Sequence, residues 1–294
     1  MSPSAPKPVP TFDLVVIGAG SAGHAAALEA AALGRRVAIV ERSPDLGGAA
    51  IPPGAPGGAA LRASAMELTG ATPAGGRRSH RADGGSVRDL LWRLDGVLDR
   101  ARQAARDRLR RARVEVVAGH ATLADAGTIR VDGPGGRTTL RAHRVLIAVG
   151  RRPGLPRAMD TDGRTVLDVD GIPGMRRVPG SLTVVGAAAP GLEYASMFAA
   201  LGARVTVIER RGAILAAADE QIASALEYHP RGLGVSFRLG HAVARVEPGP
   251  HGATWACADG TSGTADAVLV TTGRVGATDS LGLDAVGIAT DTTG

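Results

Sequence analysis

Cysteine, lysine and aromatic residues are almost absent from this chain of 294 residues. Cys257 is the only cysteine, which excludes both an intrachain disulfide and a Cys-x-x-Cys redox or zinc site. Lys7 is the only lysine, so the net charge of +6 comes almost entirely from arginine. Aromatic residues make up 2% and apolar residues 44%. The core is therefore expected to consist of Ala, Val, Leu and Ile side chains, which suits parallel sheets covered by helices.

Long apolar runs are also missing. No run approaches the ~18 apolar residues that a membrane helix needs, and residues 1–10 are proline-rich without the apolar centre of a signal peptide. The expected location is therefore the cytoplasm, with no contact to a membrane. The arginines at 100–113 continue an amphipathic helical pattern that begins at Val87 and has no interleaved aromatics, so we expect no nucleic-acid binding. A basic surface can still attract anionic ligands.

One 29-residue pattern occurs twice, at Asp13–Glu41 and at Ser181–Glu209. The copies are in register, because 186 − 18 and 209 − 41 both give 168. Each copy runs from an apolar strand through a glycine turn and an alanine-rich helix to a second apolar strand that ends in glutamate. This order predicts an α/β fold with two Rossmann-like, three-layer nucleotide-binding domains.

The first copy carries a complete glycine motif. Gly18 permits the tight turn, Gly20 lets the backbone approach a pyrophosphate, and Gly23 lets helix and strand pack closely. The N–H groups at the start of the helix then face the phosphates. Glu41 lies where such a fold places the carboxylate that accepts hydrogen bonds from ribose hydroxyls. A glycine turn that serves packing alone is the other interpretation.

The second copy has Ala188 in place of the middle glycine, and its methyl group is expected to weaken or displace pyrophosphate binding. Pro190 is tolerated in the first helical turn. Glu193 is expected either to position a nicotinamide ribose or amide, or simply to interact with the helix dipole. Glu209 favours NAD, because a carboxylate repels the 2′-phosphate of NADP, whereas the adjacent Arg210 and Arg211 weaken that preference.

Shorter patterns fill the rest of the chain. Strands of a small antiparallel insertion are expected at Val114–Val117, Thr128–Val131 and Thr138–Arg141. A second pair of similar segments, Arg144–Arg151 and Ala267–Arg274, predicts two buried strands that each leave through a glycine into an arginine turn. The expected domains are 1–153 and 154–271, each with one copy of the nucleotide-binding pattern, with 272–294 as the start of a segment that returns to the first domain.

Several separated segments resemble the flavin-dependent pyridine nucleotide-disulfide oxidoreductases, and within that family the soluble transhydrogenases. They are GAGSAG with Glu41–Arg42, the turn Leu46–Gly48, IAVGRRP at 147–153, GLEYASMF at 191–198, and GRVGATDSLGL at 273–283 followed by Val286–Ile288. The resemblance implies FAD in the first domain and NAD(H) or NADP(H) in the second. The residues expected to bind the cofactors are Gly18, Gly20, Ser21, Gly23, Glu41, Arg42, Gly47, Gly48, His120, Ala121 and Gly150 for FAD, and Gly186, Ala188, Gly191, Glu193, Glu209, Arg210 and Gly273 for the nicotinamide dinucleotide.

The chain also departs from the family's pattern. Ala50 and Ala55 stand where the disulfide reductases have cysteines, so thiol-disulfide chemistry is excluded there. Ala59 replaces a lysine whose charge would help to stabilise reduced flavin. The chain stops at Gly294, before the family's second FAD motif and its dimerisation domain, so the resemblance implies an incomplete FAD domain without the homodimer interface.

The resemblance implies hydride transfer between NAD(H) and NADP(H) through the flavin, or an NAD(P)H diaphorase of the same construction. Neither a catalytic side chain nor a metal is required. The alternative is a noncatalytic, truncated remnant of the family that binds a nucleotide without turnover. The three substituted alanines at 50, 59 and 188 favour the alternative, whereas the intact motif from Gly18 to Gly23 favours retained binding.

Overall fold

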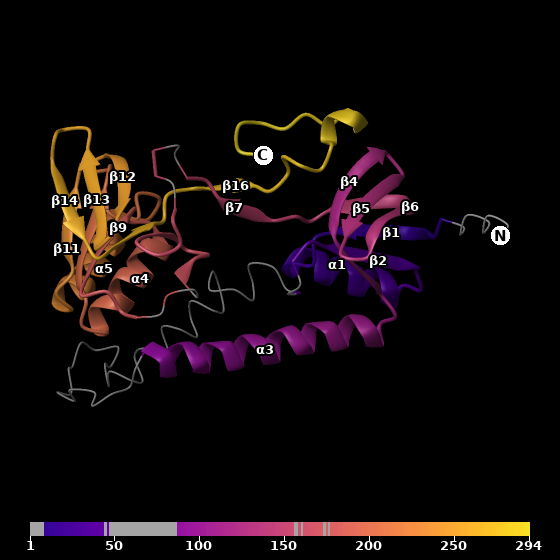
Figure 1. Cartoon of the computed structure of the whole chain (residues 1–294), viewed down its shortest axis with the longest axis horizontal. Coiled ribbons are helices and arrows are strands. Elements are labelled where there is room, and N and C mark those ends of the chain that lie inside the picture. The colour runs from indigo at the N-terminus through magenta and orange to yellow at the C-terminus, as the bar shows by residue number, and fades with distance from the viewer. Residues whose placement is uncertain are drawn as a thin grey trace. The chain divides into compact units, whose positions relative to one another are not determined.

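The computed structural model describes residues 9–43, 46, 87–155, 158–159, 161–172, 175 and 177–294, with the backbone alone for most of 87–98. The chain forms two compact units (Figure 1). Unit 1 comprises the described residues of Met1–Ile51, Asp99–Arg152 and Val275–Gly294, and unit 2 those of Pro52–Leu98 and Pro153–Arg274. Each unit has its own α/β core, as the sequence predicts.

Unit 1 contains a six-stranded sheet in the order β3-β2-β1-β6-β5-β4. Strands β3, β2, β1 and β6 are parallel, whereas β6, β5 and β4 form an antiparallel meander. The elements are β1 (Thr11–Ile17), α1 (Ser21–Ala32), β2 (Val37–Glu41), α3 (Val87–Arg111, which continues into this unit from Asp99), β3 (Glu115–Ala118), β4 (His120–Asp125), β5 (Thr128–Gly133), β6 (Gly136–Ile147) and the short helix η3 (Leu283–Val286).

The central strands of unit 1 are apolar on both faces because both faces are covered. Val16 and Ile39 pack with Ala27 of α1 and Leu109 of α3 on one side. Neighbouring residues of β1 and β2 point to the other side, where they pack against β4, β5, β6 and the segment that contains η3. Such burial explains the uninterrupted apolar runs of the two strands.

The structure corrects three predictions about the middle of the chain. The strand expected at Val114–Val117 is β3, but it extends the main sheet by pairing parallel with β2 and does not belong to an antiparallel insertion. The strands expected at Thr128–Val131 and Thr138–Arg141 do pair antiparallel, yet the second continues without a break to Ile147 as β6. This continuation was expected to be a separate buried strand, but Leu146 is 38% exposed.

Unit 2 contains an all-parallel five-stranded sheet in the order β11-β10-β9-β15-β8 and a three-stranded antiparallel sheet, β12-β13-β14. Trp255 and Cys257 of the smaller sheet pack against buried residues of the parallel strands. The elements are β8 (Val166–Asp168), β9 (Ser181–Val185), α4 (Ala189–Ala200), β10 (Arg204–Glu209), α5 (Glu220–Gly232), β11 (Ser236–Leu239), β12 (Val243–Gly249), β13 (Gly252–Cys257), β14 (Ser262–Ala265) and β15 (Ala267–Val270). Strands β7 (Arg151–Pro153) and β16 (Arg274–Gly276) pair separately.

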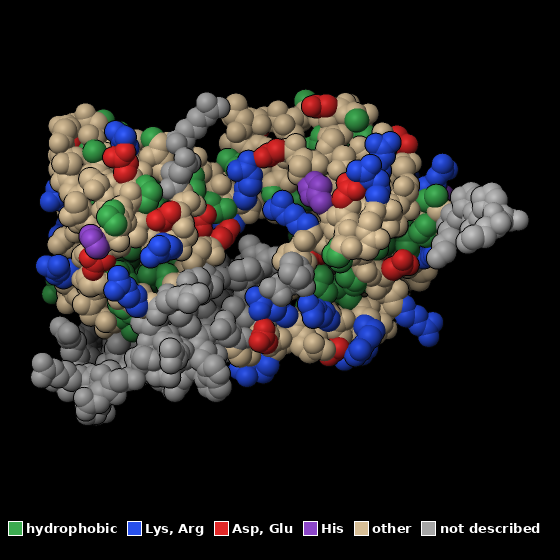
Figure 2. All heavy atoms as spheres, in the orientation of Figure 1, with side chains coloured by type: hydrophobic (Ala, Val, Ile, Leu, Met, Phe, Trp, Pro, Cys, Tyr) green, Lys and Arg blue, Asp and Glu red, His purple; other side chains and the backbone are tan. Residues whose placement is uncertain are grey.

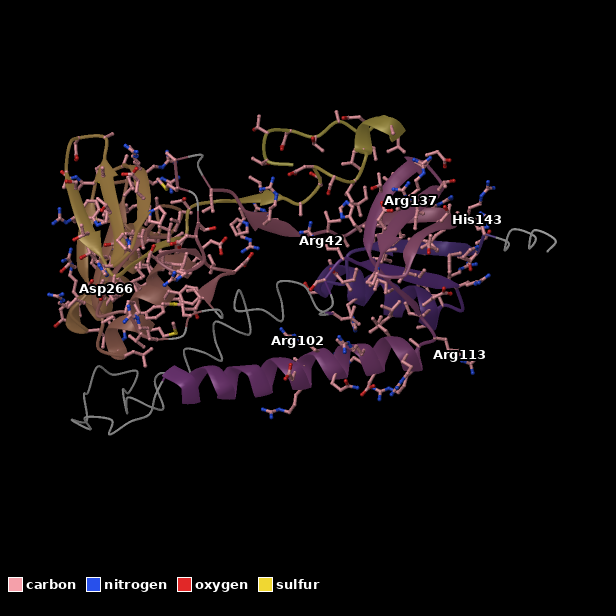
Figure 3. The ribbon with its side chains drawn as sticks, viewed as in Figure 1. Arg42, Arg102, Arg113, Arg137, His143 and Asp266 are labelled. Atoms are coloured by element: carbon pink, nitrogen blue, oxygen red, sulfur yellow. The ribbon has the colours of Figure 1, made fainter. Side chains whose placement is uncertain are left out.

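Four helices end in the same way, with one residue in the left-handed conformation and a hydrogen bond that spans five residues. In α1, α4 and α5 the left-handed residue is Gly34, Gly202 or Gly234. In α3 it is Arg113, with φ of 58° (Figure 3). The Val114 N–H donates to the Leu109 carbonyl, which completes the motif. A side chain at this position is unfavourable because its Cβ crowds the backbone.

We expect Arg113→Gly to raise the free energy of unfolding by about 0.5–1 kcal/mol, because glycine adopts the left-handed conformation without strain. Gly202→Ala is the matched control and should lower it by about 1 kcal/mol. Urea titration of the three proteins measures both changes. A less stable Arg113→Gly variant would show that the arginine side chain stabilises this helix end more than the strain opposes it.

Candidate functional site

The glycine turn of unit 1 lies between β1 and α1 and is sterically closed to side chains at two positions. Gly18 has φ of +103°, and a Cβ there would lie 2.4 Å from the Ala148 carbonyl oxygen. A Cβ on Gly23 would lie 1.9 Å from the Gly18 carbonyl oxygen. These two glycines therefore fix the turn against the sheet.

Gly20 serves a different purpose from its neighbours. It is the N-cap of α1 with φ of −69° and ψ of −175°, an extended conformation that any residue adopts. No side chain of the described residues caps this helix, and its first turn, which begins at Ser21, contains no acidic residue. The unpaired N–H groups and the positive end of the helix dipole suit an anionic group such as a pyrophosphate. A glycine at position 20 leaves space for that group.

Glu41, at the end of β2, has its carboxylate fixed beside the turn. Oε2 accepts from the Ala19 N–H at 2.7 Å, and Oε1 accepts from the Ser43 N–H at 2.9 Å. Each carboxylate oxygen can accept one more hydrogen bond, for example from a ribose hydroxyl. The adjacent cavity has a volume of about 50 Å³ and is lined in part by Gly18, Glu41, Arg42, His120 and Ala121. The described walls thus fit the ribose and pyrophosphate end of a dinucleotide, although the cavity is too small for a whole one.

The turn of unit 2 repeats this geometry in a different sequence. Gly186 has φ of +107°, and a Cβ on Gly191 would lie 2.1 Å from the Gly186 carbonyl oxygen. Ala188 is the N-cap of α4 with φ of −77° and ψ of 172°, nearly the conformation of Gly20, and no side chain caps this helix either. The substitution of glycine by alanine therefore leaves the backbone unchanged and adds only a methyl group.

Glu209, at the end of β10, makes the same two contacts as Glu41. Oε2 accepts from the Ala187 N–H at 2.8 Å and Oε1 from the Arg211 N–H at 3.0 Å, and the residue is only 9% exposed. The sequence analysis did not anticipate that this carboxylate stabilises the glycine turn. The cavity beside it has a volume of about 490 Å³ and is lined in part by Gly186, Ala188, Glu209, Arg210, Arg211, His241 and Gly273.

The remaining predicted residues do not line these two cavities, or they lie outside the described residues. The Gly150 carbonyl accepts a hydrogen bond from the Ala277 N–H at 3.1 Å. Glu193 is half-buried and follows the first turn of α4, which contains no acidic residue, so the helix-dipole interpretation is not favoured. Gly47 and Gly48 lie outside the described residues, as do the alanines at 50, 55 and 59.

His241 is a residue of the second cavity that the sequence analysis missed. Its Nδ1 lies 2.5 Å from Oδ2 of Asp259, and its backbone N–H donates to the Glu209 carbonyl. Hydrogen bonds from Thr261 and from His241 lower the pKa of Asp259 to about 2, so this carboxylate is ionised at neutral pH. His241 lies just after β11 and Glu209 is the last residue of β10, and the carboxyl ends of neighbouring parallel strands meet at one edge of the sheet.

The described side chains on the face shown in Figure 2 do not form a single large basic patch. On the face shown in Figure 2, acidic and basic side chains are interspersed over the described parts of both units. Within the described residues, no helix combines the length and apolar character that crossing a lipid bilayer requires.

Comparison with known proteins agrees with this geometry. The model of the pyridine nucleotide-disulphide oxidoreductase family matches residues 12–294. A soluble pyridine nucleotide transhydrogenase of Mycobacterium tuberculosis is 39% identical over 281 residues, which cover 94% of this chain and 60% of that protein. One from Marinomonas is 34% identical over 289 residues, which cover 96% of this chain and 61% of that protein. The chain therefore spans about 60% of the length of these relatives.

Solved structures show the same fold. The HOCl-induced flavoprotein disulfide reductase RclA from Escherichia coli, as the Cu(II) complex of its C43S mutant, superimposes with a TM-score of 0.85 at 26% identity. The match covers 97% of this chain and 62% of that one. LpdA from Mycobacterium tuberculosis gives a TM-score of 0.85 at 26% identity, over 97% of this chain and 63% of that one.

Proposed function

The chain belongs to the pyridine nucleotide-disulphide oxidoreductase family, and from this premise we propose that it is an FAD-dependent oxidoreductase that transfers hydride between NAD(H) and NADP(H). Family membership implies FAD and NAD(P)H as cofactors. The bound flavin supplies the hydride-accepting and hydride-donating chemistry, while the protein supplies binding and orientation.

The acidic and basic groups that line the second cavity support the binding of two different nicotinamide substrates. Glu209 offers a carboxylate suited to the free ribose hydroxyls of NAD(H). Arg210 and Arg211 line the same cavity and offer positive charge suited to the 2′-phosphate of NADP(H), and the His241 ring lies in the same wall. An enzyme that exchanges hydride between the two nucleotides must bind both, and the mixture of acidic and basic groups supports such dual binding.

The chain's own residues act by binding and positioning. The first-turn N–H groups of α1 hold the flavin's pyrophosphate, and Glu41 holds the adenosine ribose while it keeps the turn in place. In unit 2, α4 and Glu209 do the same for the nicotinamide dinucleotide. Cys257 takes no part, because it is buried and burial, with a smaller contribution from Asp259, raises the pKa of its thiol.

The second candidate is a nucleotide-binding protein without turnover. The Ala188 methyl group at the turn of unit 2 favours it, as does the small size of the described cavity in unit 1. The two candidates differ in one measurement, the transfer of deuteride from labelled NADPH to NAD⁺ in the presence of FAD. Deuterated NADH supports the transhydrogenase. A protein that retains FAD and binds both nucleotides but forms no deuterated NADH supports the second candidate.

We expect Asp259→Asn to weaken NADPH binding by about tenfold and to leave NADH binding within about twofold. Without the carboxylate, the His241 ring loses the hydrogen bond that orients it in the cavity, so one contact near the 2′-phosphate is weakened. Fluorescence titration of each nucleotide measures the two dissociation constants. Asp284→Asn, an acidic position in unit 1, is the control and should change neither. Equal weakening of both nucleotides by Asp259→Asn would assign His241 a purely structural role.

A further inference from the structure

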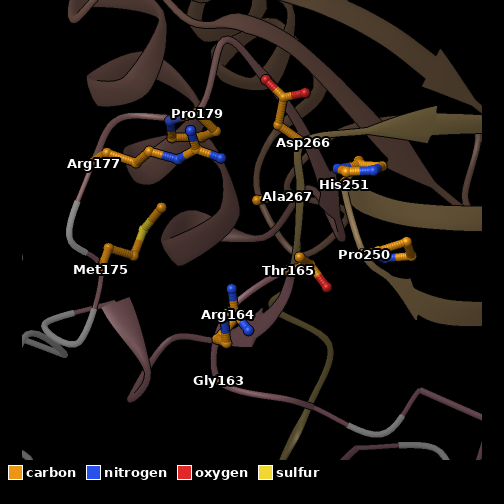
Figure 4. Close-up of a pocket in the computed structure, with 10 residues that line it drawn as sticks. All are labelled: Gly163, Arg164, Thr165, Met175, Arg177, Pro179, Pro250, His251, Asp266 and Ala267. Atoms are coloured by element: carbon orange, nitrogen blue, oxygen red, sulfur yellow. The ribbon is translucent and has the colours of Figure 1, made fainter.

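A larger cavity lies in unit 2, at the amino ends of the parallel strands (Figure 4). Its volume is about 700 Å³. Its walls come from the segments before β8, β9 and β15 and from the turn between β12 and β13, which contribute Arg164, Arg177, Asp266 and His251. The dinucleotide cavity lies at the carboxyl ends of the same strands, where Val185 and Thr271 line it. The two cavities therefore lie at opposite ends of one sheet and share no lining residue.

Among the described residues, two arginines and one aspartate line the cavity, which leaves an excess of positive charge. Arg164 and Arg177 have neither an ion pair nor a hydrogen bond from their guanidinium groups to any described residue, and the His251 ring is similarly unpaired within the described residues. Three other arginines of unit 2 are paired with carboxylates: Arg231 with Glu227, Arg245 with Glu247 and Arg274 with Asp170. In Figure 4, Arg164 and Arg177 extend from different loops along the cavity wall. Each of the two arginines can donate hydrogen bonds to an anion that enters the cavity.

Two aspartates hold these walls in place. Asp162 accepts hydrogen bonds from the N–H groups of Arg164, Thr165 and Val166, each at 2.8 Å, which fixes the loop that carries Arg164. Burial raises the pKa of Asp162, but these hydrogen bonds and the one from the Thr165 hydroxyl outweigh it and lower the pKa to about 2. The Asp162 carboxylate is therefore ionised at neutral pH, and the loop is preorganised for a ligand.

Asp266 adds an acceptor to the same cavity. Its Oδ2 accepts from the Ser181 N–H at 3.0 Å, and its own N–H donates to the Ser181 hydroxyl at 2.9 Å, so the start of β15 is tied to the start of β9. Within the described residues, Oδ1 has no partner. A ligand for this cavity therefore combines an anionic group, which the arginines attract, with a hydroxyl group that donates to Asp266.

We propose that this cavity binds a small phosphate monoester that also carries hydroxyl groups, at a site separate from the dinucleotide cavity. The phosphate dianion binds between Arg164 and Arg177, with His251 beside it, and a hydroxyl of the ligand donates to Asp266. Because both arginines are exposed, binding weakens as ionic strength rises.

Calorimetric titration of the full chain with glycerol 3-phosphate tests this proposal, with inorganic phosphate and glycerol as comparison ligands. We expect saturable binding of glycerol 3-phosphate, weaker binding of inorganic phosphate and none of glycerol. Arg164→Gln and Arg177→Gln should each weaken binding by about tenfold, the effect of losing one charged hydrogen bond. Neither variant should change the melting temperature, because both side chains are exposed and unpaired within the described part of the chain.

The variant Arg210→Gln tests whether glycerol 3-phosphate binds in the dinucleotide cavity instead, because Arg210 lines that cavity. It should leave the affinity for glycerol 3-phosphate unchanged. Absence of binding would overturn the proposal, as would binding that Arg210→Gln removes and Arg164→Gln preserves. Equal affinities for inorganic phosphate and glycerol 3-phosphate would overturn the role assigned to Asp266. Because the titration needs neither FAD nor turnover, its outcome does not depend on the proposed hydride transfer.

Discussion

Gly20→Val is expected to abolish flavin retention by unit 1 while the unit remains folded. The backbone of Gly20 is extended, with φ of −69° and ψ of −175°, a conformation that β-branched residues also adopt. The branched side chain would instead occupy the space in front of the α1 N-terminus, where the pyrophosphate is expected to bind. The measurement is the ratio of flavin to protein after gel filtration, with circular dichroism to verify the fold. We expect a loss of at least about 100-fold in affinity, as removal of several charged hydrogen bonds implies.

Two further variants show whether flavin is lost because the pyrophosphate site is blocked or because unit 1 unfolds. Gly20→Ala reproduces the sequence of the second turn, where Ala188 adopts nearly the same backbone conformation, so it should weaken flavin binding without abolishing it. Gly23→Ala should unfold unit 1, because its Cβ would lie 1.9 Å from the Gly18 carbonyl oxygen. A folded Gly20→Val protein that retains as much flavin as the parent would show that the flavin does not bind at this turn.

Glu209→Ala is expected to change both nucleotide preference and stability. Loss of the carboxylate removes the group that repels a 2′-phosphate, so the ratio of NADPH to NADH affinity should rise by about tenfold or more. The Ala187 N–H is buried and would lose its acceptor, which costs about 1–3 kcal/mol of unfolding free energy. Fluorescence titration of both nucleotides and urea unfolding measure the two effects.

The control for this variant is Glu247→Ala, which removes the same charge from unit 2 at an exposed position paired with Arg245. It should leave both the affinity ratio and the unfolding free energy nearly unchanged, since exposed ion pairs contribute little. If Glu209→Ala lowers stability but leaves the affinity ratio unchanged, Glu209 only supports the turn and does not select the nucleotide.

The sequence predicted those parts of the fold that depend on local patterns. The two strand-turn-helix-strand copies could be predicted because apolar runs, glycine turns and the terminal glutamates all lie within 29 residues. The partner of β3 could not be predicted in this way, because pairing with β2 joins segments on either side of α3. Strand β4 was missed for a related reason, since it pairs only with β5 and is held by a hydrogen bond from the Leu123 N–H to the distant Leu281 carbonyl.

The same distinction applies to the site. The spacing of the glycines and glutamates in the two copies was enough to predict both turns. Glu41 and Glu209 also accept hydrogen bonds from the N–H groups of these turns, and this second role depends on how the two strands of each copy lie side by side in the fold. His241 joins the second cavity only because β11 lies beside β10. The cavity between Arg164 and Arg177 combines segments that are separate in the sequence and have no motif of their own.

We propose that unit 1 binds FAD and that unit 2 binds both nicotinamide nucleotides. The most direct test is the visible absorbance spectrum of the purified chain after mixing with FAD and gel filtration, followed by anaerobic addition of NADPH and then of excess NAD⁺. We predict a retained flavin band that NADPH bleaches and NAD⁺ restores. A colourless protein would show that unit 1 does not bind FAD. A flavin band that neither NADPH nor NADH bleaches would show that no hydride passes from the nucleotides to the flavin.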